Sequence, residues 1–222
     1  MTPMSSSETA RPVACYVTDR HSLEMANHEA ELPALLDCIA NAARCGVDWI
    51  QIREKDLGGR ALAELVQQAM ENAPVTHILV NDRLDVAVGA GAAGVHLGAE
   101  SLPVAEAVKW CRAGHAPPGF LVGRSCHSME EALEAQRDGA DYIFFGPVFA
   151  TPSKAKYGAP QGIEKLKEVC GRAGVPVLAI GGITAENLQE CLRAGAAGIA
   201  GIRLFQEGED LTGIVRRLKA VV

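Results

Sequence analysis

The sequence predicts an α/β fold, a single-domain eightfold (β/α) barrel of the TIM type. The chain has 222 residues, a usual length for one such barrel. Eight short apolar runs alternate with windows of helical periodicity, and runs without polar alternation are typical of strands buried on both faces of a parallel sheet. An open doubly wound sheet would show a similar alternation. The closed barrel is favoured because strand number and chain length both match it.

The expected strands follow one another along the whole chain. They are VACYV (13–17), WIQI (49–52), HILV (77–80), VHL (95–97), FLVG (120–123), YIFF (142–145), VPVLAI (175–180) and GIAGI (198–202). Between them, apolar residues recur at the spacing i, i+3, i+4, i+7, which predicts helices. The clearest helical windows are 32–39, 62–69 and 211–218.

A repeated pattern supports this order of elements. A helix end followed by glycine and then a strand recurs as RCGVDWI, GAGAAGV, RDGADYI and RAGAAGI, with glycines at Gly46, Gly91, Gly139 and Gly195. Their spacing of roughly 50 residues is the length of about two strand-plus-helix units. Glycine is typical of the left-handed residue that ends a helix, so each of these four is expected to cap one.

Composition limits the partners and the compartment. The net charge of -6 opposes the broad basic surface that binds nucleic acid. No apolar run is long enough for a signal peptide core or a membrane span. Seven cysteines without a C-x-x-C pair favour reduced thiols in the cytoplasm. We expect small-molecule substrates, a disordered tail over 1–12 and a barrel domain over 13–222; the sequence leaves a homo-oligomer open.

Polar residues gather after the strands rather than before them. Loops that enter strands consist of small residues, whereas loops that leave strands carry charged and hydroxyl groups, and catalytic groups in these barrels lie at the carboxyl ends of the strands. The strand exits are Thr18-Asp19-Arg20, 53–55, 81–83, 98–101, 124–127, 146–162, 181–182, and Gly201 with Arg203.

One expected anion site lies after the last two strands. AIGGI (179–183) precedes Thr184 and an expected helix start, which lets the backbone N–H groups of Gly181 and Gly182 face an anion. Gly201 would complete this cradle, since the seventh and eighth loops form the usual phosphate site of the fold. Glycines kept only for tight turns are the alternative interpretation.

A second set of residues is suited to a diphosphate. A guanidinium, two ammonium groups and two hydroxyls bind such an anion well; they belong to Arg53, Lys55, Thr151, Ser153 and Lys154. Asp82 follows an apolar strand, where a carboxylate either neutralises these cations or holds Mg²⁺ together with phosphate oxygens.

Several polar residues close to the strands are further candidates. Gln51 lies inside an apolar run, so its amide is expected to face the barrel interior or a ligand. His127 stands close to Ser125 at a strand end, whereas an isolated histidine such as His96 is as often structural as catalytic. Cys126 would be a nucleophile only with a lowered pKa.

These motifs resemble one known family through nearly the whole chain. YVTDR (16–20), QIREK (51–55), VNDR (80–83), GVHLG (94–98), GRSCHS (123–128), GADYIFFGPVFATPSK (139–154) and AIGGI (179–183) are similar to those of thiamine phosphate synthases. The resemblance implies an eightfold barrel that joins hydroxymethylpyrimidine diphosphate to thiazole phosphate with release of pyrophosphate. Mg²⁺ is the implied cofactor.

The resemblance also implies residue roles. Gln51 would contact the pyrimidine, Asp82 would bind Mg²⁺, and Ser125 would lie at the reacting centre. Arg53, Lys55, Asn81, Thr151 and Lys154 would hold the diphosphate, with Ser153 beside them and segment 146–162 as a candidate lid. Thr151 would also help to position the thiazole phosphate, whose backbone contacts would come from Gly181, Gly182, Gly201 and Ile202.

Two departures from the family pattern matter. Ser101 stands where these synthases have a second metal-binding Asp, which makes Glu100 the candidate replacement ligand. Arg203 stands where a Ser is usual and would add a charge to the phosphate site.

Two alternatives stay open. The related thiazole tautomerase shares the motif found here as GRSCHS, and in that interpretation His127 moves a proton and no metal is needed. The loss of Asp at position 101 favours the tautomerase, whereas Lys55, Asp82 and Lys154 favour the synthase. A non-catalytic barrel that binds a phosphorylated heterocycle would use the same glycine cradle.

Overall fold

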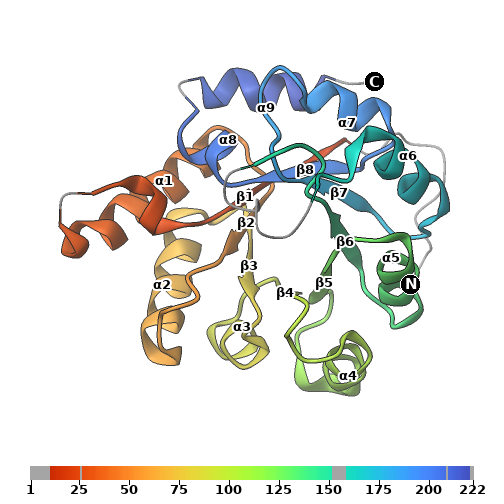
Figure 1. Cartoon of the computed structure of the whole chain (residues 1–222). Coiled ribbons are helices and arrows are strands. Elements are labelled where there is room, and N and C mark those ends of the chain that lie inside the picture. The colour runs from red at the N-terminus through yellow and green to blue at the C-terminus, as the bar shows by residue number, and fades with distance from the viewer. Residues whose placement is uncertain (1–10, 26, 152–158, 209, 221–222) are drawn as a thin grey trace.

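The computed structural model describes residues 11–25, 27–151, 159–208 and 210–220. Eight parallel strands pair in chain order, and the first pairs with the last to close the barrel. Helices surround the strands (Figure 1). The predicted eightfold (β/α) barrel is therefore confirmed. Most of the predicted tail, 1–12, lies outside the described residues.

The strands lie close to the predicted runs. They are β1 (Val13–Val17), β2 (Trp49–Ile52), β3 (His77–Asn81), β4 (Gly94–Leu97), β5 (Leu121–Cys126), β6 (Tyr142–Phe145), β7 (Val177–Ile180) and β8 (Gly198–Gly201). The largest difference is in β5, which continues to Cys126 because Ser125 and Cys126 pair with Phe144 and Phe145 of β6. Ser125 therefore belongs to a strand rather than to an exit loop.

The helices are amphipathic and bury their apolar face against the strands. They are α1 (Glu31–Arg44), α2 (Gly59–Asn72), α3 (Leu84–Ala90), α4 (Val104–Trp110), α5 (Met129–Arg137), α6 (Gly162–Arg172), α7 (Leu188–Arg193), α8 (Arg203–Gln206) and α9 (Leu211–Lys219). Short helical turns cover Arg20–Leu23, His28–Ala30 and Cys111–His115. The predicted windows fall in α1, α2 and α9.

The repeated glycines have the backbone conformation that the sequence predicts. A positive φ at these places would cost an L-residue roughly 1–2 kcal/mol. The φ angles are 87° at Gly46, 77° at Gly91, 89° at Gly139 and 98° at Gly195.

The barrel interior is apolar in its middle and polar toward the carboxyl ends of the strands. Its apolar cluster includes Val17 and Leu79. In the strand register, Val17 pairs with Gln51, and Gln51 pairs with Leu79. Gln51 therefore lies in an interior layer between two residues of that cluster, and it is 2% exposed.

Within the described ranges, no helix is both long and apolar enough to span a bilayer. All seven cysteines are unpaired thiols.

Candidate active site

A chain of hydrogen bonds links three polar residues at the carboxyl ends of β2 and β3. Gln51 Nε2 donates to Asn81 Oδ1 at 2.8 Å, and Asn81 Nδ2 donates to Asp82 Oδ2 at 2.6 Å. Because a carboxylate only accepts hydrogen bonds, Asp82 fixes the orientation of the Asn81 amide. Asn81 in turn fixes the orientation of the Gln51 amide.

The buried oxygen of Gln51 is left without a partner. Among the described residues, Gln51 Oε1 is the only buried side-chain nitrogen or oxygen atom that makes no hydrogen bond. An unpaired buried acceptor costs about 1–3 kcal/mol. A ligand that offers a hydrogen-bond donor at this point would remove that cost.

Asp82 is held ionised by its surroundings. Burial raises the pKa of its carboxyl, but hydrogen bonds from Ser101 and from Gly98 N (3.0 Å), the charge of Lys55 and the Asn81 amide outweigh burial and lower it. The Lys55 ammonium lies 3.9 Å from Asp82 Oδ2. The structure thus brings together Lys55, Asn81 and Asp82, as the sequence predicts.

Ser101 and Glu100 differ in their relation to Asp82. The Ser101 hydroxyl donates directly to Asp82 Oδ1. Glu100 is exposed, and within the described part of the chain no ion pair or hydrogen bond joins it to Asp82. In the same ranges, no group of three or more His, Cys, Asp or Glu side chains could hold a metal ion. Among the described residues, Asp82 is thus the carboxylate that the Lys55–Asn81 cluster offers to a cation.

Ser125 is connected to a buried histidine. His96 Nε2 lies 2.9 Å from Ser125 Oγ, and His96 Nδ1 lies 3.1 Å from the Tyr142 hydroxyl. His96 also stacks near Phe144, with ring centroids 4.1 Å apart. Burial raises the pKa of Tyr142 well above its usual value, so the phenol stays neutral. Sequence reasoning named Ser125 but could not connect it to His96, because their contact depends on the register of β4 and β5.

His127 is fixed by the loop that follows β6. Its Nδ1 contacts the carbonyl oxygen of Gly146. A carbonyl only accepts, so Nδ1 carries a proton and Nε2 is the basic nitrogen of the neutral ring. The neighbouring thiol of Cys126 is buried, and burial raises its pKa to about 12. Cys126 therefore lacks the lowered pKa that a nucleophile needs.

A cavity of about 700 Å³ opens beside the ends of β7 and β8. Its wall includes predicted phosphate-site residues and Thr151, which lies 3.4 Å from a guanidinium nitrogen of Arg203. The predicted members are Gly181, Gly182, Gly201, Ile202 and Arg203.

The loop after β7 differs from the prediction in one respect. The helix begins at Leu188 rather than at Thr184, because the Asn187 side chain accepts a hydrogen bond from Thr184 N at 2.8 Å. The glycine cradle is therefore formed by a loop and not by a helix N-terminus. Gly181 and Gly182 have φ angles of 95° and 67°, and a Cβ on Gly182 would lie 2.6 Å from Ala150 O.

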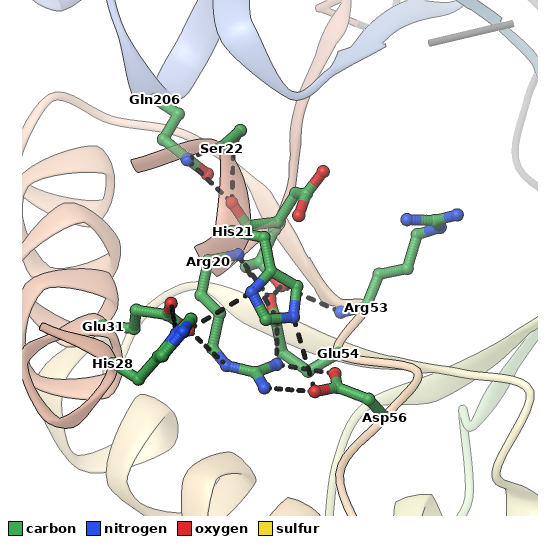
Figure 2. Close-up of polar contacts among 11 residues, drawn as sticks. Arg20, His21, Ser22, His28, Glu31, Arg53, Glu54, Asp56 and Gln206 are labelled. Carbon is green, nitrogen blue, oxygen red and sulfur yellow. Dashed lines mark hydrogen bonds and ion pairs between the residues drawn. The ribbon is translucent and has the colours of Figure 1, made fainter. Parts of the chain in front are cut away.

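The exit of β2 carries two candidate cations on either side of a buried carboxylate. The Glu54 side chain is 1% exposed and pairs with Arg20, whereas Lys55 is 60% exposed. Figure 2 shows the Arg53 side chain pointing away from the contacts around Arg20. Sequence reasoning placed Arg20 on the active face but did not predict this buried network. Ser153 and Lys154 lie outside the described residues, as does the whole of 152–158 within the candidate lid.

The protein is thus a (β/α)8 barrel whose polar layer and glycine-lined cavity lie on the face that carries the active site in enzymes of this fold. A family model described as "Thiamine monophosphate synthase" matches residues 15–205. The chain belongs to this family.

Named relatives and a solved structure agree with the family. The chain is 47% identical to a thiamine-phosphate synthase of Methanocella arvoryzae over 79% of this chain and 81% of that protein. It is 45% identical to the thiamine-phosphate synthase of Methanoculleus marisnigri over 80% of this chain and 83% of that protein. A thiamine phosphate pyrophosphorylase structure from Pyrococcus furiosus superposes with a TM-score of 0.78 at 31% identity, covering 95% of this chain and 96% of that one.

Proposed function

We propose that this protein is a thiamine-phosphate synthase, a transferase that joins the methylene carbon of hydroxymethylpyrimidine diphosphate to the ring nitrogen of thiazole phosphate and releases pyrophosphate. The carbon–oxygen bond to the diphosphate breaks and a carbon–nitrogen bond forms. Family membership and the named relatives support this activity.

The observation that carries the proposal is the unpaired Oε1 of Gln51. The bond from Gln51 Nε2 to Asn81 fixes the orientation of the amide and leaves Oε1 as a buried acceptor without a partner. Its free acceptor matches a donor such as the exocyclic amino group of an aminopyrimidine. A pyrimidine held there would place its diphosphate toward Asp82 and Lys55, since Asn81 connects the two ends of the site.

The rest of the site suits a departing diphosphate. Arg53 and Lys55 would bind its oxygens, and Lys154 belongs to the same proposal. These fixed charges stabilise the negative charge that builds up on pyrophosphate as it leaves, an effect typically worth several kcal/mol. The ring nitrogen of the thiazole needs no general base, because it attacks with its own lone pair.

Asp82 would hold Mg²⁺, and its lowered pKa keeps the carboxylate ready for that role. When bound, Mg²⁺ supplies positive charge to phosphate oxygens. Ser101 would orient Asp82 through its hydroxyl instead of adding a second ligand, and Glu100 would serve only if its exposed side chain turned toward the substrate-bound ion.

Ser125 would face the reacting centre. In the His96 tautomer that carries its proton on Nε2, the Tyr142 hydroxyl would donate to Nδ1 and Nε2–H would donate to Ser125 Oγ. This order leaves the Ser125 hydroxyl proton directed to the ligand. The thiazole phosphate would occupy the cavity beside β7 and β8, near Gly181, Gly182, Gly201, Ile202 and Arg203, with Thr151 beside it.

The direct test mixes the protein with Mg²⁺, pyrimidine diphosphate and thiazole phosphate and looks for thiamine phosphate by mass spectrometry. Product that disappears when Mg²⁺ is chelated supports the proposal. Absence of product at any Mg²⁺ concentration, from protein that binds both substrates, contradicts it.

Thiazole tautomerase activity is a second candidate, and the fixed tautomer of His127 favours it. A His127→Asn variant separates the two activities. The synthase should retain its turnover, whereas a tautomerase should lose it; the isomerisation of thiazole phosphate alone is followed by NMR. The non-catalytic alternative predicts that neither reaction occurs although thiazole phosphate binds.

We also propose that the protein works in the cytoplasm on these small molecules. The seven unpaired cysteines support a reducing compartment.

A further inference from the structure

A buried network joins the exits of β1 and β2. Arg20 is 7% exposed, and its guanidinium faces three carboxylates (Figure 2). Arg20 Nη1 lies 2.9 Å from Glu54 Oε2 and 2.8 Å from Asp56 Oδ1, and Arg20 Nε lies 3.2 Å from Glu31 Oε2. The second guanidinium nitrogen, Nη2, contacts the other oxygen of Asp56.

Thr18 connects the same network to the backbone of the β2 exit. Its hydroxyl donates to Glu54 Oε1 at 2.6 Å and accepts from Arg53 N at 2.9 Å. Thr18 N also donates to Gln51 O at 2.9 Å. Every residue from Arg53 to Asp56 except Lys55 is thus held by Thr18 or Arg20.

This arrangement decides which way the β2 exit turns. Glu54 is drawn inward to Arg20, so its neighbours Arg53 and Lys55 cannot point into the same network. Figure 2 shows Arg53 directed away from it, and Lys55 approaches Asp82. Because both neighbours depend on Glu54, a small shift of its carboxylate would move two candidate phosphate ligands together.

We propose that Arg20 is a positioning residue that acts through Glu54 and Thr18 to hold Arg53 and Lys55 against the diphosphate. The inference rests on the proposed function, since it needs a diphosphate at Arg53 and Lys55. Only arginine fits here, because lysine cannot engage Asp56 with two nitrogens while also reaching Glu54 and Glu31.

The main test uses two variants. Thr18→Val keeps the side-chain shape but removes the hydrogen bonds to Glu54 and from Arg53 N. Arg20→Lys keeps the positive charge but loses the planar guanidinium that contacts several carboxylates at once. We expect the KM for pyrimidine diphosphate and the Kd for inorganic pyrophosphate with Mg²⁺ to rise about tenfold or more. The KM for thiazole phosphate should change less than the KM for pyrimidine diphosphate, because only Asp19 and Ser22 of the β1 exit line its cavity and neither Thr18 nor Arg20 does. Thr18→Ser should restore the wild-type values.

A matched control separates positioning from stability. Lys219→Met removes the ion pair of Lys219 with Asp48 (2.8 Å), which lies away from the strand exits. It should lower the thermal midpoint and leave both KM values unchanged.

The outcomes are distinct. Wild-type protein that does not bind pyrophosphate overturns the proposed diphosphate site and this inference with it. Wild-type protein that binds pyrophosphate, with Thr18→Val and Arg20→Lys binding it equally well, overturns the inference alone. If Arg20→Lys does not fold, the comparison of Thr18→Val with Thr18→Ser decides the question.

Discussion

Gln51 Nε2 lies 2.8 Å from Asn81 Oδ1, and this contact orients the Gln51 amide so that its oxygen is the acceptor available to a ligand. The Asn81 amide is itself held by the carboxylate of Asp82. A residue that never needs to touch the pyrimidine can therefore determine which hydrogen-bond pattern the site accepts.

The first prediction concerns this orientation of the Gln51 amide. Wild-type enzyme should reject a pyrimidine diphosphate whose amino group is replaced by an oxo group, by about 10²-fold or more in kcat/KM, because two acceptors would then face each other. Asn81→Ala should reduce that discrimination, since the Gln51 amide becomes free to turn over. Steady-state kinetics with both substrates measures the ratio.

The exposed amide of Asn72, which donates to Gln68 O at 2.8 Å, gives a control. Asn72→Ala should keep the wild-type ratio. Equal discrimination by Asn81→Ala and wild type would show that Asn81 does not orient Gln51.

The second prediction concerns Asp82. Asp82→Asn should lower kcat by about 10²-fold or more, because the variant lacks the anionic ligand for a divalent cation. The thermal midpoint should fall only modestly, since the amide oxygen can keep the bonds from Ser101 and Gly98 and only the bond from Asn81 Nδ2 is lost. Titration with Mg²⁺ should show no saturable activation; full activity at ordinary Mg²⁺ would refute the metal assignment.

The third prediction concerns acid stability. The hydrogen bond to Arg20 lowers the pKa of Asp56 well below its usual range. A lowered folded-state pKa stabilises the protein above the unfolded-state pKa of about 3.9, and this contribution is lost as the pH falls through the folded-state pKa. Asp56→Asn should therefore be less stable than wild type at pH 7, by less than about 1 kcal/mol because the carboxylate is half exposed.

Urea unfolding of both proteins at several pH values checks this. The difference in free energy of unfolding should shrink below about pH 4. If the difference in free energy of unfolding stays constant down to the lowest pH at which both proteins fold, the pKa of Asp56 is not lowered in the folded protein.

The fourth prediction concerns Cys126. With its pKa raised to about 12 by burial, this thiol should resist alkylation at pH 7.5 in the native protein, while the partly exposed Cys45 should react faster than Cys126. Peptide mass spectrometry after brief iodoacetamide treatment measures both. Cys126→Ala should keep kcat within about twofold; loss of activity in a folded variant would give the thiol a role in the reaction.

The fold was predictable because the strands are short, mostly apolar runs without polar alternation and each glycine of the repeat follows a helix. Gln51 was predictable as a site residue because an amide in a buried strand needs a partner. The network around Arg20 was not predictable, because its partners Glu54 and Asp56 lie 34 and 36 residues further along the chain. The contact of His96 with Ser125 likewise depends on how two strands align, which periodicity does not specify.

The pairing of β1 with β8 has a consequence for biosynthesis. During translation the earliest strand must wait for the latest one, so the nascent polypeptide cannot complete its sheet until nearly all of it has left the ribosome. Until then, both strand edges remain open to unintended pairing, and we expect chaperones to be most important for this protein during that interval.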